Sequence, residues 1–302
     1  MYATAAIIAD TTKVAQHLPL WHAVILGITQ GLSEFLPISS SGHLILVRWL
    51  LGFNDLSPHL DKTFDVALHL GTLVGAVAYF WSDLVSYVRD GIPWLVPARR
   101  AELSAERQRN GRVAWLLIIS AIPAAIVGAL FESAVDEHAG KVWLIGIMLI
   151  VFGLVLFAAD RLSGQLEERD FDSRGAVGMG VAQALALQPG VSRSGVTMSA
   201  GRALGFSRDG AVRLSFLMSL PIIAGAVVFK GAGVVKDGLP SGMGSPFLIG
   251  IVTSAITGYI AVWGTLKIIR TRSFTPFVVY RIVAGVIVLG LFAAGFHSAA
   301  MP

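Results

Sequence analysis

The chain has 302 residues, of which 55% are hydrophobic and only 14% are charged, and its mean hydropathy is +0.72. Soluble domains carry about 25% charged residues, whereas the apolar residues here form blocks of about 18–21, long enough to cross a bilayer. The composition therefore predicts an all-α integral membrane protein of several spans. The net charge of +4 is modest and the arginines lie mostly in loops, a pattern that indicates membrane-topology signals rather than a nucleic-acid-binding surface. The absence of cysteine excludes disulfides and thiol chemistry.

The first twenty residues are not expected to be a signal peptide, because the apolar run 5–9 is short and no basic residue precedes it. Residues 21–36 and 41–51 are predicted to form two short helices, separated by Pro37 and a run of serines. Neither helix alone spans a bilayer, so the pair predicts a re-entrant hairpin lining a polar cavity. The same short–break–short pattern recurs at 175–188 and 190–205.

Six full spans are predicted between and after these hairpins: 64–81, 113–131, 142–160, 211–230, 246–266 and 276–296. The segments 82–112 and 161–174 are rich in arginine and are expected to be polar loops. The loop 82–112 is assigned to the cytoplasm, and the chain then alternates sides across the full spans. Apart from Arg48, Arg193 and Arg281, which fall within apolar segments, this places fifteen basic residues inside and five outside. The positive-inside rule supports this orientation, which puts both termini and the mouth of the first hairpin on the outer side.

An internal repeat accompanies these elements. Gly27, Gln30, Leu32, Ser39, Ser41 and Gly42 each have an identical residue 153 positions later. We predict a single membrane domain, 1–302, made of repeat 1 (21–160) and repeat 2 (175–296). Each repeat holds one hairpin and three spans; three is odd, so the second copy is inverted in the membrane. Inverted repeats with broken helices place a binding site at their interface.

The first hairpin holds a carboxylate at membrane depth. Glu34 lies four residues after Gln30, so both side chains project from one face of a helix. A buried carboxylate in a membrane costs roughly 2.5–3.5 kcal/mol on insertion scales, which marks Glu34 as a functional candidate. It could bind a divalent cation, with Gln30 as a further ligand or positioning residue, or act as an acid or base. The alternative for Glu34 is a structural ion pair with an arginine.

Serines and a histidine follow the break. Ser39, Ser40, Ser41 and Gly42 precede or begin a helix, where hydroxyls and free N–H groups can cap the helix, bind an anion, or do both. His43 stands on the first turn of that helix. It could be a nucleophile that forms a phosphohistidine, or a general acid or base; a packing role is the alternative.

The second hairpin supplies the cation that the first lacks. Arg193 is the only charged residue between Arg174 and Arg202, and its planar fork suits phosphate oxygens. An ion pair with Glu34 before substrate arrives is compatible with that role. Ser192, Ser194 and Thr197 are predicted to be supporting hydrogen-bond donors to the substrate. Two further pairs, Asp65 with His69 and Asp209 with Arg213, have the i,i+4 spacing of structural ion pairs, and they are assigned no catalytic role.

The segments Gln30–His43 and Pro189–Thr197 resemble the two signature motifs of the bacitracin-resistance family of bacterial undecaprenyl-diphosphate phosphatases. The likeness covers most of the chain in motif order and spacing. Many members carry Glu where this chain has Gln30, which weakens any scheme that needs two carboxylates on the metal. The family usually has threonine where this chain has Ser41, so the hydroxyl is kept.

The resemblance implies an inner-membrane enzyme that hydrolyses the C55 lipid diphosphate to its monophosphate and inorganic phosphate. This reaction recycles the carrier lipid for peptidoglycan synthesis and confers bacitracin resistance. The resemblance also implies dependence on Mg²⁺ or Ca²⁺, and Glu34, Ser40, His43 and Arg193 correspond to the family's proposed catalytic residues. The nucleophile, His43 or Ser40, is left open, as is the oligomeric state, with a homodimer as one option. A transporter or flippase of the lipid phosphate using the same site is the alternative function.

Overall fold

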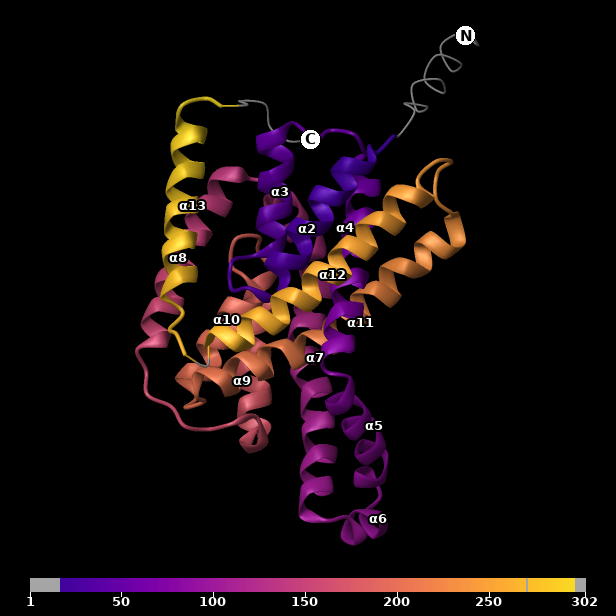
Figure 1. Ribbon diagram of the computed structural model, residues 1–302, viewed down its shortest axis with the longest axis vertical. Coiled ribbons are helices and arrows are strands. Elements are labelled where there is room, and N and C mark those ends of the chain that lie inside the picture. Colours follow the sequence, from indigo (N-terminus) through magenta and orange to yellow (C-terminus); the bar gives the residue numbers. More distant parts are fainter. Residues whose placement is uncertain (1–16, 270, 297–302) are drawn as a thin grey trace.

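The computed structural model describes residues 17–269 and 271–296, apart from the side chains of 132–139 and 233–237. The expectation about a signal peptide concerns residues that lie mainly outside this range. The described part is helical and contains no strand, only an isolated bridge between Leu166 and Phe206. The chain runs through α2 (Leu20–Phe35), α3 (Ser40–Leu51), α4 (Pro58–Tyr79), α5 (Trp81–Leu95), α6 (Pro97–Glu102), α7 (Ala105–Ala139), α8 (Val142–Asp160), α9 (Ser173–Ala184), α10 (Arg193–Ala203), α11 (Arg208–Asp237), α12 (Gly244–Ile269) and α13 (Thr275–Ala293), with single 3₁₀ turns at Glu168–Asp170 and Leu185–Leu187 (Figure 1).

Five of the described helices are long and apolar enough to span a membrane: α7, α8, α11, α12 and α13. The helices α4 and α5 together form a sixth candidate, bent by 83° at Phe80. The protein is therefore an all-helical, multi-pass membrane protein. The predicted span 142–160 coincides with α8, and the four short helices of the two broken pairs lie within a few residues of their predicted limits. In the second pair the helix α9 ends at Ala184 and a 3₁₀ turn continues it to Leu187.

The prediction of a polar loop over 82–112 is wrong. This segment forms α5, α6 and the start of α7, which extend together from one end of the molecule (Figure 1). The fully buried Asp90 carboxylate accepts hydrogen bonds from Arg89, Arg107 and Asn110, and the Trp115 indole donates to the carbonyl of Gly91. The charges that suggested a solvated loop instead bind one another across a helical hairpin.

Small residues allow the helix α12 to cross close to α2 and α4. A Cβ on Gly31 of α2 would lie 2.7 Å from the Ser254 carbonyl oxygen, and one on Gly75 of α4 would lie 2.4 Å from the Ala255 carbonyl oxygen. Membrane helices gain their association energy from such close backbone packing, because lipid supplies no hydrophobic driving force between them. This contact fixes α2, whose last turn carries Glu34.

Candidate active site

Two helix breaks share one unusual backbone conformation. Ser39 has a φ of 80° and Ser192 a φ of 75°, and no other non-glycine residue in the described part has a positive φ. Each serine caps the helix that follows it: Ser39 Oγ accepts from the Gly42 N–H at 3.4 Å, and Ser192 Oγ from the Gly195 N–H at 3.1 Å. The two breaks therefore present the starts of α3 and α10 in the same local geometry.

Direct hydrogen bonds join the two breaks although more than 150 residues separate them. The Gly190 N–H donates to Ser39 Oγ at 2.9 Å, and Ser194 Oγ donates to the Leu36 carbonyl at 2.9 Å. Gly190 has a φ of 93°, and a Cβ at this position would lie 2.7 Å from the Cβ of Met148, so glycine is required here. These contacts bring the last turn of α2 against the first turn of α10.

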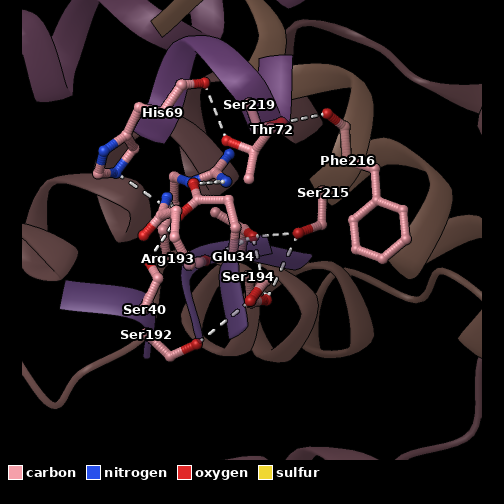
Figure 2. Close-up of polar contacts among 12 residues, drawn as sticks. Glu34, Ser40, His69, Thr72, Ser192, Arg193, Ser194, Ser215, Phe216 and Ser219 are labelled. Atoms are coloured by element: carbon pink, nitrogen blue, oxygen red, sulfur yellow. Dashed lines mark hydrogen bonds and ion pairs between the residues drawn. The ribbon is translucent and has the colours of Figure 1, made fainter. Parts of the chain in front are cut away.

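Glu34 is the centre of the polar cluster at this junction (Figure 2). Its side chain is 4% exposed, and Arg193 Nη2 lies 2.7 Å from its Oε1. Its Oε2 accepts from Ser40 Oγ at 2.5 Å and from Gln30 Nε2 at 2.9 Å. The ion pair of Glu34 with Arg193, which the sequence left open as an alternative, is present, and Gln30 and Ser40 also lie beside the carboxylate.

Two buried polar atoms of this cluster have no hydrogen-bond partner among the described residues, Arg193 Nη1 and Gln30 Oε1. Leaving a buried polar atom unpaired costs about 1–3 kcal/mol, and more for a charged group. One atom is a cationic donor and the other is a neutral oxygen acceptor. Arg193 Nη1 can therefore still bind an anion, and Gln30 Oε1 can still bind a cation or accept a hydrogen bond.

The remaining predicted hydroxyls divide into two groups. Ser192, Ser194 and Thr197 are buried and bond to the protein itself. The Ser192 and Ser194 hydroxyl oxygens lie 3.2 Å apart (Figure 2), and Thr197 Oγ1 lies 2.7 Å from Ser215 Oγ. Ser41 is half-buried on the first turn of α3, and its hydroxyl forms no hydrogen bond with another described residue. The first group braces α10, whereas Ser41 remains able to contact a ligand.

His43 does not contact the Glu34 cluster. Its Nδ1 lies 2.7 Å from the Ser39 carbonyl oxygen, and its Nε2 lies 2.7 Å from the Tyr280 hydroxyl. The ring also stacks on Tyr280, with 5.6 Å between the ring centroids. Tyr280 comes from α13, outside both motifs, and no sequence pattern pointed to it.

His69 is a site residue that local spacing concealed. The expected side-chain pair of Asp65 with His69 is wrong: the Asp65 carboxylate accepts from Arg48, and His69 Nδ1 bonds the Asp65 backbone carbonyl at 2.7 Å. His69 Nε2 therefore faces Glu34 Oε2, 3.6 Å away (Figure 2). The i,i+4 spacing suggested a local pair, but a histidine within an apolar span was itself a functional signal.

Arg213 likewise has longer-range partners than its predicted local pair with Asp209. It forms ion pairs with Asp83 on α5 and with Glu168 in the 3₁₀ turn. The first pair joins α11 to α5 and the second joins it to the 3₁₀ turn, so the assignment of a structural role to Arg213 agrees with its contacts.

The described residues contain no group of three or more His, Cys, Asp or Glu side chains placed to hold a metal ion. A Mg²⁺ or Ca²⁺ ion can nevertheless be bound by one or two protein oxygens together with substrate phosphate and water. The Gln30 amide donates from Nε2 to the Glu34 carboxylate, and its oxygen Oε1 has no partner among the described residues. The carboxylate and this amide oxygen therefore lie side by side and fit that kind of shared site. A dication caged by protein ligands alone does not fit the residues present.

The fold and this cluster define a class: a multi-pass helical membrane protein with a buried carboxylate–guanidinium pair between two helix breaks. The chain belongs to the family described as bacitracin resistance protein BacA, whose model matches residues 23–287. It is 48% identical over 281 residues to an undecaprenyl-diphosphatase of Pelobacter propionicus, covering 91% of this chain and 98% of that protein. Proteins of the same name from Trichlorobacter lovleyi and Geobacter sulfurreducens are 44% and 45% identical, over 93% and 91% of this chain and all of theirs.

Proposed function

We propose that this protein is an undecaprenyl-diphosphatase of the bacterial inner membrane. It hydrolyses undecaprenyl diphosphate to undecaprenyl phosphate and inorganic phosphate, which returns the carrier lipid to peptidoglycan synthesis and confers bacitracin resistance. The names of relatives that match over most of the chain support the reaction. The observation that carries the proposal is the buried Arg193–Glu34 pair with its unused guanidinium nitrogen.

Arg193 and the start of α3 are assigned to the diphosphate. The free Nη1 of Arg193 can bind a phosphate oxygen while Nη2 still holds Glu34, and the planar fork can then stabilise charge that develops on the transferring phosphoryl group. The first-turn N–H groups of α3 and the Ser41 hydroxyl add neutral donors. Because Arg193 Nη1 is buried in the absence of substrate, binding must first expose it.

Of the two candidate nucleophiles, the geometry favours Ser40. Its hydroxyl already donates to Glu34, as a nucleophile does to its general base, whereas His43 is held by Ser39 and Tyr280. We assign Ser40 Oγ to attack the terminal phosphorus and Glu34 to take the hydroxyl proton, with undecaprenyl phosphate as the leaving group. Water then hydrolyses the phosphoserine and releases inorganic phosphate.

A divalent cation, Mg²⁺ or Ca²⁺, is the proposed cofactor. Glu34 and Gln30 would hold it together with substrate oxygens, and when bound it would neutralise charge on the diphosphate. In the absence of substrate the protein side of this site is already ordered, because Gln30 Nε2 fixes the amide against Glu34.

We further propose the finer architecture expected from the sequence: six full spans and two re-entrant hairpins, arranged as inverted repeats 21–160 and 175–296. The matching φ angles and caps at Ser39 and Ser192 support it. Both termini and the site opening would face outward. Single cysteines in the cysteine-free chain at exposed Ser241 and Arg109 test this orientation. An impermeant thiol reagent should label Ser241→Cys and not Arg109→Cys in spheroplasts; the reverse pattern would invert the topology.

The test of the function is release of inorganic phosphate from undecaprenyl diphosphate by the purified protein, with Mg²⁺ or Ca²⁺ present. Arg193→Ala and Ser40→Ala should lose activity by about 100-fold or more. Ser199→Ala is the matched control, because Ser199 is a buried serine of α10 that bonds only the Gly195 carbonyl within its own helix. No release by the wild type rejects the enzyme, and full turnover in both site variants rejects the site. The flippase alternative finds no support in the relatives' names.

A further inference from the structure

Arg281 is a fully buried arginine in the middle of the apolar helix α13. Among the described residues, its hydrogen-bond partners are all backbone carbonyl oxygens. Nε donates to Leu149 at 3.1 Å and Nη1 to Pro37 at 2.9 Å. Nη2 lies 2.8 Å from the Gly190 oxygen, 3.0 Å from that of Val191 and 3.3 Å from that of Met148. A guanidinium group is thus spread over three segments that are distant in sequence.

Two of these segments are the breaks that form the site. Pro37 lies two residues before Ser39, and Val191 lies directly before Ser192. Both serines hold a positive φ, a conformation that costs a non-glycine residue about 1–3 kcal/mol and persists only where the surroundings enforce it. Arg281 contacts both breaks at once and is therefore placed to enforce both conformations.

The direction of these bonds also orients the donors of the second break. In a planar trans peptide the carbonyl and the following N–H point in opposite directions. Because the Val191 carbonyl points at Arg281, the Ser192 N–H points away from Arg281. The N–H groups of the first turn of α10 follow directly in the chain, and that of Gly195 is capped by Ser192 Oγ. Arg193 directly follows Ser192, so the same bonds set the position from which its side chain reaches Glu34.

We propose that Arg281 is a positioning residue for the phosphate site, which fixes the two breaks so that Ser40 and Arg193 meet the diphosphate in a productive geometry. It does not touch the reacting atoms. This role rests on the proposed function, and it assigns part of the site's precision to a helix that carries neither signature motif. A misplacement of about 1 Å in such a site can cost roughly 100-fold in rate.

Arg281→Lys is the direct test, because lysine keeps the charge but lacks the fork that reaches several carbonyls. Arg202→Lys is the matched control: Arg202 is also buried, lies on α10, and donates to the carbonyls of Phe206 and Leu162, away from the breaks. We expect Arg281→Lys to lower kcat for phosphate release about tenfold or more with little change in KM. Arg202→Lys should lower the unfolding temperature by a similar amount and leave kcat near the wild-type value.

Hydrogen–deuterium exchange provides a readout that does not depend on activity. Peptides covering 36–42 and 188–195 should exchange faster in Arg281→Lys than in Arg202→Lys, while α12 should be unchanged in both. Gly195→Ala provides a second variant if Arg281→Lys does not fold. Its new Cβ would lie 3.2 Å from Arg281 Nη1 and also 3.2 Å from Ser192 Cβ and Oγ, so it would crowd the guanidinium group against the second break without removing it. It should also lower kcat, by a smaller factor.

If the peptides covering the two breaks exchange equally fast in Arg281→Lys and in Arg202→Lys, the positioning role is overturned. A loss of kcat in Arg281→Lys no greater than in Arg202→Lys would overturn it as well. A wild-type protein that releases no phosphate would reject the proposed function instead. In that case the exchange experiment still decides whether Arg281 fixes the two breaks.

Discussion

The Glu34–Arg193 ion pair allows stability and activity to be separated in a double-mutant cycle. Arg193 Nη2 lies 2.7 Å from Glu34 Oε1, and the side chains of Glu34 and Arg193 are 4% and 15% exposed, respectively. Removing one partner of a buried pair costs about 3–5 kcal/mol, because the other charge stays buried and uncompensated. After Arg193→Met, Glu34 keeps its hydrogen bonds from Ser40 and Gln30, so we expect a loss near the lower limit, about 3 kcal/mol.

Glu34→Gln leaves Arg193 without its carboxylate and should cost about the same, roughly 3 kcal/mol. The double variant Glu34→Gln/Arg193→Met contains neither charge, so it should lose no more stability than either single variant. Thermal unfolding in detergent measures this, with a change of roughly 2 °C expected for each kcal/mol in a chain of this size. Each single variant should therefore unfold about 6 °C below the wild type.

Activity should not follow stability in this cycle. Phosphate release should fall by about 100- to 1,000-fold in Arg193→Met and should stay equally low in the double variant, because the cation for the phosphoryl group is still missing. A double variant whose stability loss equals the sum of the two single losses would show that the charges are not coupled. A double variant that regains turnover would refute the assignment of Arg193 to the phosphate.

Three further predictions concern packing, His43 and the cofactor. Gly31→Ala should destabilise the protein by about 1–3 kcal/mol, because its Cβ would lie 2.7 Å from the Ser254 carbonyl oxygen. Gly264→Ala on α12, which has open space, should be neutral or stabilising in the same unfolding assay; equal losses in both would contradict the packing argument. Tyr280→Phe keeps the ring but loses the hydroxyl bound to His43. Because Ser40 and not His43 is the assigned nucleophile, kcat should stay near the wild-type value; a loss of about tenfold or more would instead point to a reactive His43. Chelation of divalent cations should abolish phosphate release and added Mg²⁺ or Ca²⁺ should restore it, so full activity after chelation would reject the cofactor.

Helix positions were well predicted where the signal is local. The span 142–160 is apolar throughout and coincides with α8. Proline and serine runs likewise marked both breaks within a few residues. The prediction failed over 82–112, because average hydropathy counts the charge of Asp90 as solvated and takes no account of its pairing with Arg107, which allows the Asp90 carboxylate to be buried.

The site was only partly predictable for a related reason. Glu34 and Arg193 were recognisable because each is an isolated charge in apolar surroundings, and such a charge needs a partner or a function. His69 was assigned to Asp65 because i,i+4 spacing is visible in sequence, whereas the true partner of Asp65, Arg48, lies on another helix. Tyr280 and Arg281 belong to no motif, and their partners lie at least 90 residues away.

The sequence by itself thus determined the membrane class, the two breaks and the charged residues that must be compensated within them, since each follows from composition or from local chain stiffness. Only the tertiary structure decided which groups compensate them. It directs Arg193 to Glu34, Tyr280 to His43 and Arg281 to the carbonyls of both breaks. The physical reason is that a buried polar group must find a partner somewhere, but its own segment does not specify where that partner lies.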